Sequence, residues 1–216
     1  MIFVENVTKR YRMRDGSWRT IVDGVNAVIR PGDKVGILGR NGAGKSTLIR
    51  ILARVEHPAS GRVVHGMTVS WPLGMGIGLQ SSMSGADNVR FVARLYGKDP
   101  AEMMQSVESF AELGEYMGMP AKTYSSGMMG RLQFGLSFAL DFDCYLIDEA
   151  TATGDSRFVE RARRAFADRT RDRSLIMVSH QAATIRSYCQ TAAVLNQGKL
   201  TFYEDMDEAF AAYEAS

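Results

Sequence analysis

A glycine-rich run with a single lysine is where residue types and spacing first point to chemistry. The run GRNGAGKST covers residues 39–47, and Gly39, Gly44, Lys45 and Ser46 fit the pattern G-x-x-x-x-G-K-[ST]. Glycines allow successive main-chain N–H groups to turn inward around a chain of phosphates. In such a loop the lysine reaches the β- and γ-phosphates, and the serine hydroxyl coordinates Mg²⁺. We therefore expect a nucleotide phosphate site built from Gly39, Arg40, Asn41, Gly42, Ala43, Gly44, Lys45, Ser46 and Thr47.

Two adjacent carboxylates follow a short apolar run later in the chain. CYLIDEA covers residues 144–150, and its four apolar residues precede Asp148 and Glu149. The run predicts a buried strand, and ligands of open α/β sheets bind at the carboxyl edge where such a strand ends. Asp148 is then a candidate magnesium ligand, and Glu149 a candidate base that accepts a proton from an attacking water. The alternative is a solvated acidic turn, but the phosphate-binding pattern elsewhere in the chain favours the catalytic interpretation.

Two further side chains are candidates for the same chemistry. IMVSHQ ends another apolar run, so His180 is expected at the sheet edge that carries Asp148, where it contacts the γ-phosphate. Gln80 lies in GLQSSMSGADN, a loop flanked by glycines, and its amide is a candidate partner for Mg²⁺ and the attacking water. Alone, Gln80 carries almost no signal, and a lone histidine is more often structural than functional.

The elements that must position these residues predict an α/β fold. IFVENVT and IVDGVNAVI alternate like half-buried strands, and Asp15-Gly16 between them predicts a hairpin. A strand-like run, DKVGILG, precedes the glycine-rich loop, and helical spacing follows it, which favours a phosphate site over an ordinary turn. CYLID, SLIMVS and TAAVL alternate with helical stretches, which indicates βαβ units and a parallel sheet. Helical segments broken by glycine and proline predict an insert at approximately 81–140.

Composition narrows the class of protein. The chain has 216 residues, 45% hydrophobic and 23% charged, with a formal net charge of +2. These values fit one globular domain over residues 1–216 and are too weakly basic to imply nucleic acid as a partner. Cys144 and Cys189 show no paired spacing, which favours a reducing compartment. The N-terminus does not read as a signal peptide, and no apolar run approaches the ~20 residues that span a bilayer, so any role at a membrane falls to a peripheral subunit.

The order of these motifs resembles the ATP-binding subunit of an ABC transporter. From Tyr11 to His180 the chain shows a phosphate-binding loop, a Gln loop, a signature, an Asp-Glu strand, an Asp loop and a histidine. The family signature, typically Leu-Ser-Gly-Gly-Gln, falls on YSSGM at residues 124–128, within TYSSGMMGRL. The resemblance implies a RecA-like P-loop NTPase core, with a parallel sheet, an N-terminal antiparallel β subdomain and an inserted helical subdomain. It also implies ATP and Mg²⁺ as cofactors and ATP hydrolysis as the reaction.

The resemblance also implies a homodimer with composite ATP sites. Ser125 and Gly127, with Ser126 between them, would bind the γ-phosphate held by the opposite subunit, and Asp155 would make a contact across the dimer. A serine hydroxyl, glycine N–H groups and a helix start form a plausible anion cradle on physical grounds. Tyr11 matches the aromatic residue that stacks on adenine, and the alternative is an ordinary tyrosine at a strand end.

The chain departs from the common family pattern in two motifs. Tyr124, Ser126 and Met128 replace the usual signature residues, and Gly154 replaces the leucine that usually precedes the aspartate of the Asp loop. Ser126 is a place where a side chain crowds a loop that often uses glycine. Serine and glycine remain at the phosphate-facing positions, so we expect the ATP contact to survive.

A longer resemblance points to a substrate class. Residues 69–97, with YSSGM and ATGDSRF, resemble the subfamily that exports capsular polysaccharide and O-antigen. O-antigen members often carry a C-terminal carbohydrate-binding domain, and the chain stops at Ser216 without one, which favours the capsule type. The resemblance implies a separate dimeric transmembrane permease, a capsule export machinery and a peripheral location on the cytoplasmic face of the inner membrane. Three alternatives stay open: export of O-antigen or another polysaccharide or lipid-linked glycan, a soluble ATPase acting on DNA or ribosomes, and a regulatory module with weak turnover.

Two stretches leave a choice between a binding surface and ordinary packing. Nine of the 13 methionines lie in the range from Met67 to Met129. They either form an adaptable docking surface or fill gaps in a small helical core. RFVERARRAFADRTRDR at 157–173 has seven arginines, which suit an anionic lipid or nucleic acid. The simpler interpretation is the solvated face of an amphipathic helix, and we expect its inner face to carry Phe158, Ala162, Ala165 and Phe166.

Overall fold

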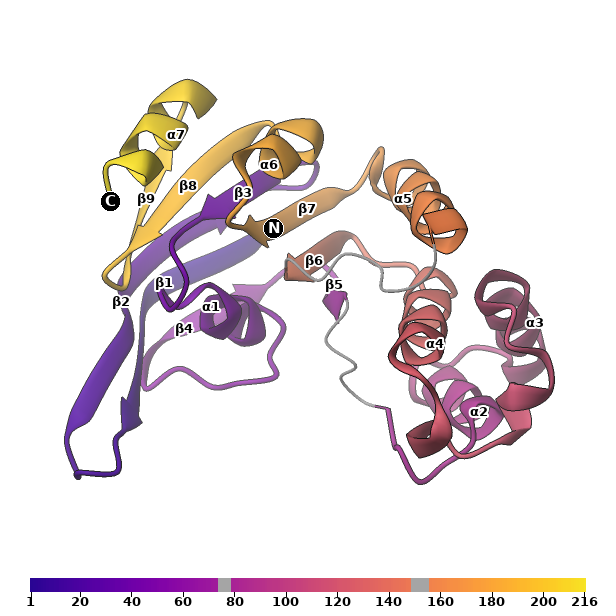
Figure 1. Ribbon diagram of the computed structural model, residues 1–216. Coiled ribbons are helices and arrows are strands. Elements are labelled where there is room, and N and C mark those ends of the chain that lie inside the picture. The colour runs from indigo at the N-terminus through magenta and orange to yellow at the C-terminus, as the bar shows by residue number, and fades with distance from the viewer. Residues whose placement is uncertain (74–78, 149–155) are drawn as a thin grey trace. The chain divides into compact units, whose positions relative to one another are not determined.

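The computed structural model describes residues 1–73, 79–148 and 156–216 (Figure 1). They form two compact units. The sheet unit comprises residues 1–72, 142–149 and 172–216, and the helical unit comprises residues 73–141 and 150–171.

A six-stranded sheet forms the centre of the sheet unit. Its strand order is β5-β6-β7-β3-β8-β9. Strands β6, β7, β3 and β8 run parallel to one another, and β9 is antiparallel to β8. The strands are β3 (Lys34–Leu38), β5 (Val69–Leu73), β6 (Cys144–Asp148), β7 (Ser174–Ser179), β8 (Thr191–Asn196) and β9 (Lys199–Tyr203). Every residue of β7 is buried, as expected for a strand inside a covered parallel sheet. The parallel sheet predicted from the short apolar runs is confirmed.

The N-terminal part of the sheet unit is a separate antiparallel sheet. It has the order β2-β1-β4, from β1 (Ile2–Arg12), β2 (Trp18–Ile29) and β4 (Ser60–His65). The predicted hairpin is present: Asp15 Oδ1 accepts hydrogen bonds from the Ser17 N–H at 2.9 Å and its hydroxyl at 2.7 Å, and Gly16 has a φ of 84°. The buried residues of both sheets share one apolar core with helix α1 (Lys45–Leu52). Helices α6 (Ala182–Tyr188) and α7 (Met206–Glu214) complete the unit (Figure 1).

The helical unit contains the segments expected from the broken helical pattern. These are α2 (Gly85–Leu95), α3 (Pro100–Ala111), η1 (Gly114–Gly118), η2 (Ala121–Thr123) and α4 (Ser126–Phe138). Ser84, Asp99 and Ser125 cap the starts of α2, α3 and α4 by accepting hydrogen bonds from main-chain N–H groups. Helix α5 (Ser156–Thr170) belongs to the same unit although it lies beyond the expected insert.

Aromatic rings and ion pairs hold α5 in the helical unit. Phe158 packs edge-on against Phe110 and Phe134, with ring centroids 5.6 and 6.2 Å apart. The predicted amphipathic helix is confirmed, because Phe158, Ala162 and Phe166 are buried, with Ala165 half-buried. Its arginines form ion pairs within the chain, which agrees with the simpler interpretation. Among the methionines, Met103 and Met117 are buried and Met119 is exposed, so neither interpretation holds for all of them.

Candidate functional site

The glycine-rich loop joins the end of β3 to the start of α1, the context that the sequence predicts. Gly42 and Gly44 have φ angles of 83° and 105°, which side chains disfavour. A Cβ on Gly39 would lie 2.7 Å from the main-chain oxygen of Leu195, so glycine is required there too. Helix α1 has no side-chain cap and no acidic residue in its first turn. Its first N–H groups therefore suit an anion.

Lys45 is folded back across this loop. Its Nζ donates hydrogen bonds to the main-chain oxygens of Gly39 at 2.6 Å and Arg40 at 3.2 Å, and the residue is only 7% exposed. Burial lowers the pKa of Lys45, and the nearby Asp148 carboxylate opposes that shift. Thr47 is also buried, and its hydroxyl accepts a hydrogen bond from Arg50.

Three predicted residues lie at neighbouring strand ends of the sheet unit. Asp148 ends β6 beside Val178 of β7, and Leu38 of β3 pairs with Ser179 of β7. Asp148, His180 after β7 and the glycine-rich loop after β3 therefore share the carboxyl edge of the sheet. Asp148 is buried, whereas His180 is exposed. Asp148, His180 and the loop that carries Lys45 thus lie along one edge, and their roles stay a prediction.

Helix α7 and Ser216 just beyond it each contact this edge, which sequence reasoning missed. The Tyr213 hydroxyl donates a hydrogen bond to the main-chain oxygen of His180 at 3.3 Å. Arg40 in the glycine-rich loop donates to the main-chain oxygen of Ser216 at 2.8 Å. Arg186 of α6 lies over the Phe210 ring at 4.7 Å and holds the helix in place. No sequence signal separates Tyr213 from any other tyrosine of an amphipathic helix.

Tyr11 is held by a hydrogen bond to Glu56, which follows α1 and also binds two basic side chains. Its hydroxyl donates to Glu56 at 2.5 Å, and Glu56 also forms ion pairs with Lys9 at 2.9 Å and Arg50 at 3.1 Å. Partial burial raises the pKa of Glu56, but hydrogen bonds from Tyr11, Lys9 and Arg50 outweigh it, so the pKa is lowered overall. The Lys9 ammonium also lies 5.2 Å from the centre of the Tyr11 ring. The ring is thereby oriented by charged neighbours, and adenine stacking stays a prediction.

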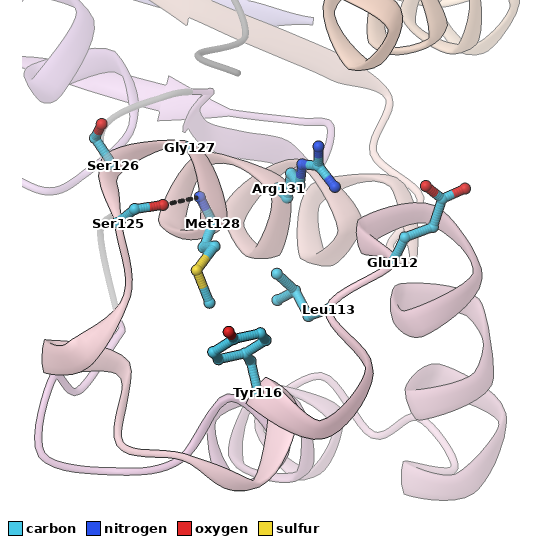
Figure 2. A pocket seen from close by; sticks show the side chains of 8 residues that line it. All are labelled: Glu112, Leu113, Tyr116, Ser125, Ser126, Gly127, Met128 and Arg131. Carbon is cyan, nitrogen blue, oxygen red and sulfur yellow. Dashed lines mark hydrogen bonds between the residues drawn. The ribbon is translucent and has the colours of Figure 1, made fainter. Parts of the chain in front are cut away.

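The signature residues line a pocket within the helical unit (Figure 2). The Ser125 hydroxyl accepts a hydrogen bond from the Met128 N–H at 3.2 Å and caps α4. The pocket has a volume of about 610 Å³ and is lined by Glu112, Leu113, Tyr116, Ser125, Ser126, Gly127, Met128 and Arg131. Figure 2 shows the Ser126 side chain pointing away from the centre of the pocket, so it does not fill this space.

Positive charge gathers beside that pocket. Arg161 forms an ion pair with Glu112, and hydrogen bonding to Arg161 lowers the pKa of this carboxyl, as do the charges of Arg161, Arg157 and Arg131. Arg131 lines the pocket, and its guanidinium lies 5.3 Å from the centre of the Phe158 ring. A helix start, a serine hydroxyl and nearby arginines together suit an anionic ligand.

Gln80 lies at the start of the loop that leads into α2, where Asn88 holds its main chain. The Asn88 side chain accepts from the Gln80 N–H at 2.7 Å and donates to the Gln80 oxygen at 3.0 Å. Asn88 was missed at the sequence level. The sequence feature that could have indicated it is a polar residue on the apolar side of a helix, beside Val89 and Val92. Glu149 and Asp155, the remaining candidates, lie outside the described residues.

Comparison with known proteins decides the family. The model of the ABC transporter family matches residues 22–152. The chain belongs to the ABC transporter family. It is 48% identical over 213 residues to the ATP-binding protein BexA of Haemophilus influenzae, covering 99% of this chain and 98% of the relative. It is 47% identical over 215 residues to the capsule polysaccharide export ATP-binding protein CtrD of Neisseria meningitidis serogroup B, covering 100% and 99%.

Solved structures support the same fold. The dimeric, post-hydrolysis ATP-binding cassette MJ0796 bound to ADP and Pi has a TM-score of 0.76 at 20% identity, over 93% of this chain and 96% of that one. The domain is thus an ABC cassette, whose nucleotide is ATP. Within the described ranges, each helix is too short or too polar to cross a bilayer.

Proposed function

We propose that this chain is the ATP-hydrolysing subunit of an ABC transporter that exports capsular polysaccharide. The ATPase part is supported by the shared sheet edge of Lys45, Asp148 and His180. The substrate class is supported by full-length similarity to the capsule polysaccharide exporter subunit of Neisseria meningitidis. In this role, residues 1–216 are one ATPase domain, with a helical insert at approximately 81–140.

Different residues bind the phosphates, the adenine and the magnesium ion of Mg²⁺-ATP. The main chain of residues 39–47 and the Lys45 ammonium hold the phosphates, and Tyr11 stacks on adenine. A magnesium ion fits this edge, because Ser46 and buried Asp148 offer the hydroxyl and carboxylate oxygens that Mg²⁺ prefers. A magnesium ion held there would supply positive charge that neutralises the phosphates. Gln80 is the third ligand that we assign to it.

Hydrolysis needs a base and a positioned water. We assign the base to Glu149, which follows Asp148 in the chain. His180 and the Gln80 amide orient the γ-phosphate and the water, so catalysis is mainly positioning and charge stabilisation. Burial lowers the pKa of Lys45, and the nearby Asp148 carboxylate opposes that shift by favouring the charged ammonium.

The signature completes each site from a second copy of the chain. Ser125, Ser126 and Gly127 supply a hydroxyl and N–H groups at the start of α4, where Arg131 adds positive charge. Asp155 makes a further contact across this homodimer. ATP therefore closes two composite sites, and its hydrolysis reopens them.

An apolar face of α2 is our candidate docking site for the membrane permease. Phe91, Leu95 and Tyr96 are 44%, 67% and 41% exposed on this helix and its C-cap. Exposed apolar side chains that are grouped in this way are typical of protein interfaces. A permease dimer bound here would hold the chain at the cytoplasmic face of the inner membrane.

Co-purification from the native host tests the transporter assignment. A tagged chain, extracted from membranes in detergent, is expected to bring down a multi-span membrane protein in equal amount. A Leu95→Glu variant should lose that protein, whereas Gln105→Glu, on the exposed side of α3, should keep it. Recovery with ribosomes or DNA, or only in the soluble fraction, would contradict the exporter assignment.

A further inference from the structure

The segment after Gln80 is paired with the segment before the signature. The N–H of Ala121 donates to the oxygen of Met83 at 2.8 Å, and the N–H of Lys122 donates to Ser81 at 2.7 Å. Ser84 and Pro120 form an isolated antiparallel bridge between the same segments. The two loops that carry Gln80 and Ser125 are therefore joined by main-chain hydrogen bonds although they are far apart in sequence.

Asn88 fixes the Gln80 end of this pair. The residue is fully buried, and its amide nitrogen donates to the oxygens of Gln80 at 3.0 Å and Ser84 at 2.9 Å. Its Oδ1 accepts from the Gln80 N–H at 2.7 Å. A buried amide with all these partners holds the loop in one conformation, since each broken bond would leave a buried polar group unpaired.

Tyr124 fixes the signature end. Its hydroxyl donates to the main-chain oxygen of Tyr116 at 2.6 Å. A Cβ on Gly85 would lie only 2.3 Å from that hydroxyl, so the tyrosine rests directly against the start of α2. The first residue of the signature and the first residue of α2 are thus packed together. Tyr124 stands where the family typically has leucine, which has no hydroxyl to make this bond.

We propose that Asn88 and Tyr124 are positioning residues that make Gln80 and Ser125 move as one rigid block. The role of this block rests on the proposed function. When a membrane partner displaces α2, the signature would be displaced together with it. Helix α2 connects the block to the proposed docking face. Asn88 lies on its buried side, and Phe91 and Leu95 lie on its exposed side. Neither Asn88 nor Tyr124 needs to touch the nucleotide.

Hydrogen exchange of the full chain without nucleotide tests the link by itself. Asn88→Asp removes the amide donations of Asn88 at nearly constant size, and Tyr124→Phe removes only the hydroxyl. Each variant should speed exchange at least about fivefold in both segments, 80–85 and 119–128, because Tyr124→Phe loses one hydrogen bond and Asn88→Asp loses more than one. Gln105→Glu and Tyr203→Phe are the matched controls and should change neither segment. An effect confined to the loop that carries the substitution would overturn the proposal, and Tyr124→Phe decides it if Asn88→Asp fails to fold.

Steady-state ATP hydrolysis tests the role of the block. Both variants should lower kcat about fivefold or more with little change in the KM for ATP, because the phosphate loop lies in the other unit. The double variant should be no worse than the poorer single variant, as expected for residues that act through one block. Additive losses, or a raised KM with an unchanged kcat, would overturn the proposal. An inactive wild-type chain would contradict the proposed function, and the exchange result would still decide the link.

Discussion

The Nζ of Lys45 lies 2.6 Å from the main-chain oxygen of Gly39, at the opposite end of the phosphate-binding loop. The lysine therefore closes the loop on itself, at the place where we propose that it meets a phosphate. Burial lowers the pKa of the ammonium, and its presence costs free energy in the folded chain. We infer that the arrangement serves ligand binding more than stability.

Replacement of Lys45 tests that interpretation. Lys45→Ala should lower ATP hydrolysis by about two orders of magnitude or more, the usual effect of removing one group that stabilises transition-state charge. Its melting temperature should not fall, because a buried charge has been removed. A variant that loses activity together with several degrees of melting temperature would show that Lys45 holds the loop together.

The ring and the hydroxyl of Tyr11 have different expected roles, which substitutions can distinguish. The hydroxyl bonds Glu56 at 2.5 Å, whereas stacking on adenine needs only the ring. Tyr11→Ala should weaken ATP binding about 5- to 150-fold, equivalent to ~1–3 kcal/mol of stacking, and Tyr11→Phe should bind nearly as the wild type does. Titration with ATP measures both. Equal losses in the two variants would assign the effect to the Glu56 hydrogen bond.

The contact between Gly85 and Tyr124 predicts that a second substitution at Tyr124 restores stability lost by a substitution at Gly85. Gly85→Ala brings a Cβ to 2.3 Å from the Tyr124 hydroxyl, so the variant should melt several degrees lower than the wild type. Tyr124→Leu removes the hydroxyl and should restore part of that loss in the double variant. If the two substitutions are additive, the packing of these residues is not what requires glycine.

The two cysteines predict a response to alkaline pH. Burial raises the pKa of both Cys144 and Cys189 to about 12. Above the ordinary thiol pKa of 9.0, the unfolded chain loses protons that the folded chain keeps, so the free energy of unfolding should fall as the pH rises from 9 toward 12.

Iodoacetamide and chemical denaturation measure this behaviour. Both thiols should resist iodoacetamide in the folded protein at pH 8 and react after unfolding. Cys144→Ala/Cys189→Ala should flatten the alkaline decline of stability. Rapid labelling of the native chain at pH 8 would contradict the burial of these side chains.

Much of the sheet unit could be predicted from sequence because its signals are local. The glycines and Lys45 of the phosphate loop follow one short pattern, and the apolar run before Asp148 predicts a buried strand by itself. Parallel strands then bring Asp148 and His180 to one edge by geometry alone.

Contacts between distant segments could not be predicted in this way. Asn88 and Tyr124 gain their importance from a pairing of loops that no periodicity shows. Helix α5 was correctly predicted as amphipathic, yet the partner of its apolar face is decided by Phe110 and Phe134, which precede it in the chain. The acceptor for Tyr11 was hidden for the same reason, since Glu56 follows α1 and meets β1 only in the folded chain.

In the proposed function, ATP hydrolysis by this chain drives polysaccharide out of the cell. The most direct test replaces the wild-type chain in its native host by Glu149→Gln, at equal abundance, and measures where the polysaccharide accumulates. We predict that surface polysaccharide is lost and that polymer collects inside the cell. Normal surface polysaccharide in cells that contain only the variant would contradict the claim.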